Sequence, residues 1–240
     1  MGDEHIKENR NRIRAMFDAI AFRYDCLNHW LSLRRDVAWR TALLDMLPCC
    51  TRMRILDLAT GTGDVLLALL SGTDAEYFVA GADISSGMLR GAQAKAAQAG
   101  VQDRCALAAA AAESLCFADN LFDVVTVAFG VRNFSDRHAG LSEMCRVLRP
   151  GGRALILEFS LPENAFIRTV YLAYFRTVLP AVAGWLSRRP EAYRYLNRSV
   201  EAFPDPVAFC QSLKEAGFQR TARQRLTFGI ATLYIAYKTH

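Results

Sequence analysis

The fold is decided by residues 55–64, which read Ile-Leu-Asp-Leu-Ala-Thr-Gly-Thr-Gly-Asp. An apolar run over 53–58 leads into this stretch, and the apolar residues 65–70 after it are typical of a helix. The sequence therefore predicts a strand, a tight turn and a helix. Gly61 and Gly63 carry no Cβ, so the turn can bend sharply and approach a ligand closely. The unpaired N–H groups at the start of the helix favour a nucleotide-like ligand.

Acidic residues beside the turn indicate which nucleotide it binds. The dinucleotide fingerprint Gly-x-Gly-x-x-Gly has a third glycine, where this chain has Leu66. Asp57 and Asp64 would repel a pyrophosphate and suit a ligand with an ammonium and a sulfonium. Asp83 ends the apolar run 77–82, where a carboxylate can accept hydrogen bonds from both ribose hydroxyls. The pattern resembles that of S-adenosylmethionine-dependent methyltransferases; the alternatives are a capping role for Asp57 and a helix-dipole role for Asp64.

From residue 52 onward, predicted strands and helices alternate, which is typical of a parallel sheet covered on both faces. We therefore predict an α/β fold of the Rossmann-like class I methyltransferase type, with a seven-stranded, mostly parallel sheet that ends in a hairpin over 218–237. Ligands are expected at the carboxyl ends of the strands. The predicted strands before the hairpin are 53–58, 77–83, 104–109, 122–129 and 153–159, and the predicted helices between them are 63–71, 86–99 and 137–148.

A single domain is expected to contain four segments. Residues 1–51, with amphipathic helices over 9–21 and 34–47, form a helical cap that either covers the cofactor site as a lid or only packs on the sheet. The cofactor-binding core is 52–160, a helical insertion that covers the substrate is 161–204, and the final helix and hairpin are 205–240.

Composition excludes several classes of protein. The 240 residues, 52% of them hydrophobic, suffice for one sizeable core and not for two ordinary domains with a linker. Because no long uncharged apolar run occurs and residues 1–14 are charged, we expect a cytoplasmic protein. Seven cysteines without a Cys-x-x-Cys pair predict buried, reduced thiols, and the four histidines lack metal-ligand spacing, so no metal is expected.

The net charge of +5 is unevenly spread along the chain. Lys and Arg outnumber Asp and Glu by 10 to 7 in residues 1–54 and by 11 to 5 in 161–240, whereas 55–160 carry 8 against 12. The basic ends suit nucleic acid, an anionic membrane surface or only water. Because the basic residues form no long tract, we expect no nucleic-acid partner.

Residues 129–133, Phe-Gly-Val-Arg-Asn, make the resemblance specific. They are similar to the F-G-x-R-N motif of the ubiquinone and menaquinone biosynthesis C-methyltransferases, the family that includes demethylmenaquinone methyltransferase. Tyr24-Asp25-x-x-Asn28, Leu-Glu-Phe-Ser at 157–160 and Tyr-Arg-Tyr-Leu at 193–196 match the same family. The resemblance extends from about residue 10 to the C-terminus and implies S-adenosylmethionine as the cofactor.

The resemblance implies cofactor contacts at Thr62, at Asp83 and at the pair Ala111 and Ala112, with Ala128 nearby. Family members often have Asn or Asp where this chain has Ala111, and some have Ser where it has Ala128. Only the backbone can therefore contact the adenine edge at residue 111. Together with the turn, the predicted cofactor site contains Asp57, Gly61, Thr62, Gly63, Asp83, Ala111, Ala112 and Ala128.

The chemistry implied by the resemblance is methyl transfer to a ring carbon of a prenylated quinol. A phenol, with a pKa of about 10, must lose its proton before the neighbouring carbon becomes nucleophilic. Arg132 is the predicted catalytic residue, because a guanidinium stabilises the oxyanion. Since arginine stays protonated, water, His29, Asp25 or Tyr195 is expected to take the proton. The alternative for Arg132 is a structural ion pair at a helix start.

An aromatic, basic stretch over 161–189 is expected to cover the prenyl tail and to touch the membrane surface peripherally. A core stripe or a homodimer contact is the alternative. Another small aromatic or lipid acceptor, a nucleic-acid methyltransferase and a noncatalytic cofactor-binding protein are the competing functions. The aromatic and aliphatic members of the stripe are Tyr171, Tyr174, Phe175, Val178, Leu179, Val182, Trp185 and Leu186.

Overall fold

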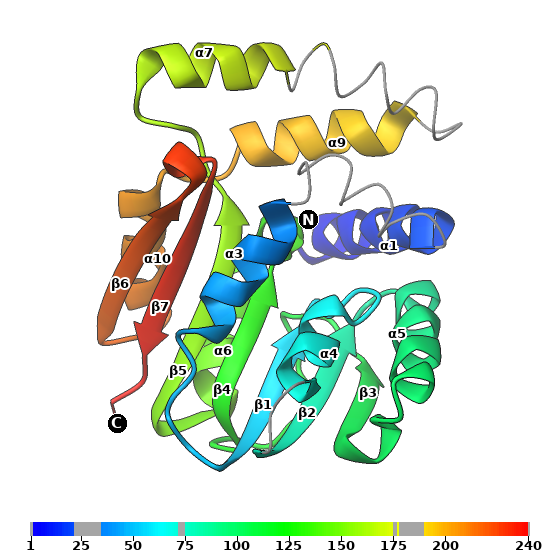
Figure 1. The fold of residues 1–240 in the computed structure, drawn as a ribbon. Helices are drawn as coiled ribbons and strands as arrows, with labels where there is room; N and C mark the ends of the chain where they lie inside the picture. Colours follow the sequence, from blue (N-terminus) through cyan, green and yellow to red (C-terminus); the bar gives the residue numbers. More distant parts are fainter. Residues whose placement is uncertain (1, 22–34, 72–74, 175–176, 178–189, 240) are drawn as a thin grey trace.

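The computed structural model describes residues 2–21, 35–71, 75–174, 177 and 190–239. Their centre is a seven-stranded sheet in the order β3-β2-β1-β4-β5-β7-β6 (Figure 1). The first five strands are parallel, and β7 is antiparallel to β5 and β6, which confirms the predicted fold. The strands are β1 Arg52–Leu58, β2 Glu76–Asp83, β3 Cys105–Ala109, β4 Phe122–Ala128, β5 Leu148–Phe159, β6 Arg220–Leu226 and β7 Ala231–Tyr237.

Helices cover both faces of the sheet because its central strands are apolar on both sides. Leu43 of α3 and Leu66 of α4 pack with Ile55 on one face, and Met144 of α6 and Phe209 of α10 pack in the cluster on the other. The helices are α1 Gly2–Ile20, α3 Arg35–Leu44, α4 Asp64–Leu70, α5 Ser86–Gln98, α6 Arg137–Val147, α7 Ala165–Ala173, α9 Pro190–Glu201 and α10 Pro206–Glu215.

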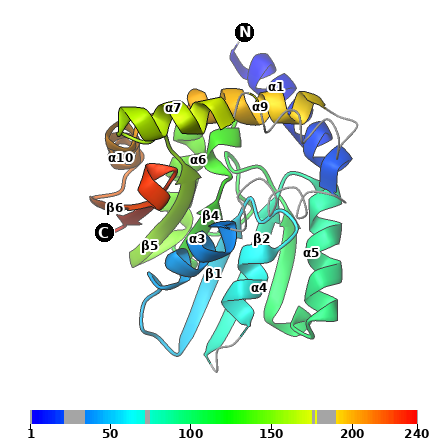
Figure 2. The ribbon, with the colours of Figure 1, turned by 45° about the horizontal axis from the view of Figure 1, so that its top comes forward.

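The remaining helices lie at the end of the sheet where the parallel strands finish. Both views place α1, α7 and α9 over the carboxyl ends of the central strands (Figures 1 and 2). The Asp18 carboxylate of α1 accepts hydrogen bonds from Ser85 Oγ at 2.6 Å and from Gly87 N at 2.8 Å. The first helix is therefore attached to the N-terminus of α5, and it does not merely pack on the sheet.

Several details differ from the predictions. α1 begins at Gly2 and not at residue 9, and α3 ends at Leu44 and not at residue 47. β5 begins at Leu148 and not at residue 153, because the turn over 149–152 is an irregularity within the strand, where the pairing with β4 shifts register. Burial of most cysteines was also a wrong prediction. Among the described cysteines only Cys145 is buried, because the others lie in loops, at strand edges or on a helix flank that apolar neighbours in the sequence do not reveal; Cys49, Cys50 and Cys116 are exposed.

The described residues contain neither a membrane-spanning helix nor a cluster of metal ligands. No described helix is both long and apolar enough to cross a membrane. Within the same part of the chain, no three His, Cys, Asp or Glu side chains are grouped so that they could hold a metal ion.

The packing of α10 makes a testable prediction. The ring centroid of the fully buried Phe209 lies 4.9 Å from that of Phe203 and 4.7 Å from that of Tyr234. We expect Phe209→Ala to lower the free energy of unfolding by about 3–5 kcal/mol in a urea titration, because it leaves a cavity. Val207→Ala, on the exposed side of the same helix, is the control and should change it by about 0.5 kcal/mol or less. Equal losses would contradict this orientation of α10.

Candidate cofactor and substrate site

The glycine turn after β1 has the conformation that its sequence requires. Gly61 and Gly63 have φ values of +56° and +86°, in the left-handed region that favours glycine. A Cβ added to Gly63 would lie 3.0 Å from Cβ of Ala92 on α5. Gly63 therefore permits close packing of the turn against α5, and it is Gly61 that lines the pocket.

Asp57 lies beneath the turn and is buried, with 1% of its surface exposed. Its carboxylate accepts hydrogen bonds from Thr60 Oγ1 at 2.6 Å and from Thr126 Oγ1 at 2.8 Å. Burial raises the pKa of Asp57 to about 6, although these hydrogen bonds act in the opposite direction. The residue thus joins β1, the turn and β4, as the capping alternative predicts.

Asp83, at the end of β2, is in contact with both the turn and the pocket. Gly61 N donates to its Oδ2 at 2.9 Å and Ser85 N donates to its Oδ1 at 2.8 Å. Burial raises the pKa of Asp83, and the two backbone hydrogen bonds oppose the rise. Each carboxylate oxygen has a second lone pair, so the side chain can still accept hydrogen bonds from two ribose hydroxyls.

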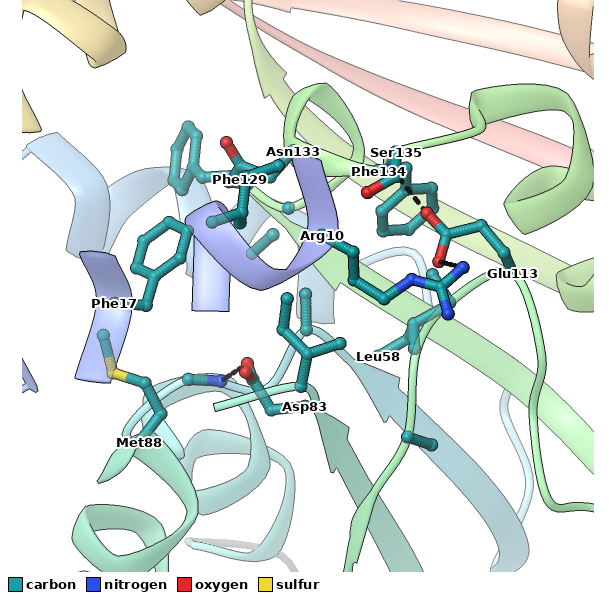
Figure 3. Close-up of a pocket in the computed structure, with 18 residues that line it drawn as sticks. Arg10, Phe17, Leu58, Asp83, Met88, Glu113, Phe129, Asn133, Phe134 and Ser135 are labelled. Carbon is teal, nitrogen blue, oxygen red and sulfur yellow. Dashed lines mark hydrogen bonds and ion pairs between the residues drawn. The ribbon is translucent and has the colours of Figure 1, made fainter. Parts of the chain in front are cut away.

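A pocket opens between α1 and the carboxyl ends of β1, β2 and β4 (Figure 3). The space between its walls, with the open solvent at its mouth included, is about 630 Å³. Asp83 and Glu113 are the acidic side chains of its lining and Arg10 is the basic one, and most of the other lining residues are apolar. The lining residues include Ile13, Leu58, Gly61, Asp83, Ile84, Met88, Ala110, Ala112, Ala128, Phe129 and Asn133.

The predicted cofactor residues divide into two groups. Gly61, Asp83, Ala112 and Ala128 line the pocket. The others lie next to it without lining it: Thr62 Oγ1 accepts a hydrogen bond from Lys95 Nζ at 3.2 Å, and Ala111 forms an isolated bridge with Ser114. As described above, Asp57 holds the turn by hydrogen bonds, and Gly63 allows the turn to pack against α5. Their part in cofactor binding stays a prediction.

A helical lid over the cofactor site was one predicted alternative for residues 1–51, but the sequence did not show which side chains of α1 reach the pocket. Arg10 and Phe17 both line it, and Arg10 Nη2 lies 3.6 Å from Glu113 Oε2 on the opposite wall (Figure 3). Glu113 Oε1 also accepts hydrogen bonds from Ser135 N and Asp136 N, at 2.5 and 3.2 Å. The Ala-Glu pattern pointed to the region of Glu113, whereas helical spacing alone does not reveal which helix faces a ligand.

Arg132 lies on the short helix η3, Val131–Asn133, just behind the pocket. Its Nη1 donates to Glu158 Oε1 at 2.7 Å, and both side chains are buried. The guanidinium carbon lies 5.2 Å from the ring centroid of Phe159 and 6.0 Å from that of Phe129. Burial raises the pKa of Glu158 to about 7, while the charges of Arg132 and Arg137 oppose the rise. The ion pair that was the alternative for Arg132 is therefore present.

Of the three side chains predicted as proton acceptors, the structure describes only Tyr195. Asp25 and His29 lie outside the described residues, as does the stretch 178–189 of the aromatic segment. The Tyr195 hydroxyl donates to Asn133 Oδ1 at 3.1 Å, and its pKa is raised, chiefly by burial. Since a tyrosine must be ionised to accept a proton from a phenol, this environment makes Tyr195 a poor base.

The doubly covered sheet with its antiparallel β7 is the fold of the class I S-adenosylmethionine-dependent methyltransferases, and the pocket lies at the carboxyl edge where this fold binds ligands. Residues 4–238 match the model of the ubiE/COQ5 methyltransferase family. The chain belongs to this family, as the F-G-x-R-N resemblance predicted.

Known proteins similar to this chain support the assignment. The ubiquinone/menaquinone biosynthesis C-methyltransferase UbiE of Geobacter sulfurreducens is 43% identical over 97% of the chain and 91% of its own length. The demethylmenaquinone methyltransferase of Thermus thermophilus is 45% identical over 92% of the chain and 98% of its own length. Among solved structures, a SAM-dependent methyltransferase from Thermotoga maritima has a TM-score of 0.68 at 15% identity, covering 94% of this chain and 99% of its own. That likeness concerns the fold.

The environment of Asp57 predicts how stability depends on pH. Because its pKa rises from 3.8 to about 6 on folding, the folded protein binds a proton that the unfolded chain has released, and the free energy of unfolding falls as pH rises through this range. Asp57→Asn should flatten that fall by about 3 kcal/mol in urea titrations between pH 4 and 7. Asp45→Asn, at an exposed site, serves as the control. An unchanged pH dependence in Asp57→Asn would contradict the raised pKa.

Proposed function

We propose that this protein transfers the methyl group of S-adenosylmethionine to a ring carbon of a prenylated quinol. The observation that carries the proposal is the position of the F-G-x-R-N residues: Phe129, Gly130 and Asn133 line the pocket, and Arg132 lies behind them. The names of the relatives in quinone biosynthesis support the same acceptor. A demethylmenaquinol and a polyprenyl methoxybenzoquinol are the two substrates of this kind.

The pocket residues fit the cofactor by their chemistry. The carboxylate of Asp83 would hold the ribose hydroxyls, while the apolar side chains of Ile84 and Met88 would contact the adenine. Backbone groups at Gly61, Ala111 and Ala112 complete the proposed contacts. When bound, S-adenosylmethionine supplies an electrophilic methyl group on a sulfonium.

Arg132 is proposed to stabilise the oxyanion of the quinol. Its Nη1 binds Glu158, but its buried Nε has no hydrogen-bond partner among the described residues, so the guanidinium retains a donor. The guanidinium is buried beside the packed rings of Phe129 and Phe159, which exclude water and strengthen its interaction with an anion. A buried ion pair and a role toward the substrate are therefore compatible in the same side chain.

The helical insertion over 161–204 is proposed to cover the prenyl tail. Its helix α7 lies over the carboxyl end of the sheet (Figure 2) and exposes Phe166 and Val170, which are 77% and 54% exposed and four residues apart on one face. The exposed Arg168 lies between them in the sequence. Such a face suits peripheral contact with an anionic membrane on its cytoplasmic side, where a prenylated substrate is available.

The proposed function is tested by anaerobic incubation of the protein with S-adenosylmethionine and a chemically reduced demethylmenaquinol, or its benzoquinol counterpart. Mass spectrometry should detect one added methyl group on a ring carbon, and the preferred ring identifies the substrate. If the protein binds the cofactor and methylates neither quinol, the proposed acceptor is wrong.

The Asp83 assignment makes a prediction for cofactor affinity. Asp83→Ala should weaken S-adenosylmethionine binding, measured by isothermal titration calorimetry, by about tenfold or more, because charge-assisted hydrogen bonds contribute about 1.5–3 kcal/mol. Asp83→Asn retains an acceptor and should lose less. Asp103→Ala changes an exposed carboxylate outside the pocket and is the control. Undiminished affinity in Asp83→Ala would exclude Asp83 from the site.

The role of Arg132 is tested separately. Arg132→Ala should reduce kcat by about a hundredfold or more, the usual effect of losing an oxyanion donor, while the Kd for the cofactor changes little. Arg132→Lys retains the charge but loses the fork of donors, so an intermediate kcat is expected. Full turnover in Arg132→Ala would remove this residue from the mechanism.

A further inference from the structure

Three buried polar atoms next to the pocket have no hydrogen-bond partner among the described residues. They are Oε2 of Glu158, Nε of Arg132 and Nε of Arg137, on β5, η3 and the first residue of α6. A buried polar group without a partner destabilises the folded protein by about 1–3 kcal/mol. Three such atoms on neighbouring elements indicate a site for a polar ligand.

This cluster adjoins the pocket. Phe129, whose ring faces the Arg132 guanidinium, and Asn133, the residue after Arg132, both line the pocket. With Glu158 ionised, two guanidinium groups and one carboxylate give the cluster a single positive charge. The titratable or charged groups that interact electrostatically with Glu158 are Arg132, Arg137, Tyr195 and Tyr234, and Tyr171 interacts with Arg132.

We infer that Glu158 accepts the proton of the quinol hydroxyl and that Arg132 and Arg137 hold the oxyanion that results. The inference rests on the proposed function, because it requires a hydroxylated ring as the ligand. The O–H bond of the quinol breaks, an O–H bond forms at Glu158 Oε2, and the electron pair stays on the ring oxygen. The total charge does not change, and Glu158 returns the proton to solvent before the next turnover.

Glu158 suits this role better than the other carboxylates of the site. The described hydrogen bonds occupy Asp57 with two hydroxyl donors, Asp83 with two N–H donors, and Glu113 with two N–H donors and the Arg10 ion pair. Of the two Glu158 oxygens, Oε1 is bound by Arg132, and Oε2 has no hydrogen-bond partner in the part of the chain that the structure describes. The Glu158 pKa of about 7 is closer to the pKa of a phenol than the pKa of an ordinary carboxyl group is. The ionised Glu158 is therefore a stronger base than an ordinary carboxylate.

The pH dependence of turnover tests the inference. With the cofactor saturating, kcat/KM of the wild type should rise with pH through about 7, as Glu158 becomes ionised. Glu158→Gln should lower kcat about a hundredfold or more and lose this rise, while Glu158→Asp should retain part of both. Glu143→Gln also breaks a carboxylate–arginine pair, with Arg146 at 2.6 Å, but outside the pocket, and should keep the wild-type profile. A wild-type profile in Glu158→Gln would overturn the inference.

A second methyl acceptor distinguishes proton transfer to Glu158 from a purely structural role of this residue. A halogenated hydroquinone has a more acidic hydroxyl, so the loss caused by Glu158→Gln should shrink at least tenfold with this acceptor. If the carboxylate only positions Arg132, the losses with the two acceptors will be equal, and the inference is overturned.

A readout without turnover distinguishes failure of this inference from failure of the proposed function. The infrared difference between wild type and Glu158→Gln should show a carboxyl band that titrates near pH 7 and changes when the quinol is added. If neither quinol is methylated, the proposed function is wrong, and an unresponsive band then overturns the role of Glu158 as well. If methylation occurs and the band does not titrate near pH 7, only the role of Glu158 is wrong.

Discussion

The site depends on a carboxylate buried at the centre of the sheet. Asp57 accepts hydrogen bonds from Thr60 in the turn and from Thr126 on β4, and thereby fixes the turn relative to two neighbouring strands. Asp83 holds the same turn from the β2 side through Gly61 N. Burying a carboxylate is unfavourable unless hydrogen bonds compensate it, and here those hydrogen bonds set the shape of the pocket wall. Asp57 therefore acts on the pocket without lining it.

The sequence predicts the fold, and the turn and acidic residue at the carboxyl ends of β1 and β2, because these features follow from local patterns. The turn over 60–63, the acid that ends β2 and the alternation of strands with helices each depend on residues close together in the chain. The contribution of Arg10 could not be predicted, since an amphipathic helix does not reveal what its polar face contacts. Arg132 and Glu158 were each noticed, but their pairing joins residues 26 positions apart, on elements whose approach only tertiary structure defines.

The two halves of the site have opposite electrostatic character. Asp83 and the turn make the cofactor side acidic, as a sulfonium ligand requires, whereas Arg132 and Arg137 make the region behind Phe129 basic, as an oxyanion requires. The aromatic side chain of Phe129 lies at the boundary, lining the pocket and facing a guanidinium. Under the proposed function, this division suits a cationic cofactor and an anionic acceptor at the same carboxyl edge of the sheet.

The contact between the turn and α5 makes residues 63 and 92 depend on each other. A Cβ at Gly63 would lie 3.0 Å from Cβ of Ala92, so the separation of turn and helix is set by one methyl group. A larger side chain at residue 92 would press on the turn that holds Gly61 against Asp83, although Ala92 does not line the pocket. Related chains should therefore vary at these two positions jointly, and exchanges at 92 should act on the site through backbone displacement.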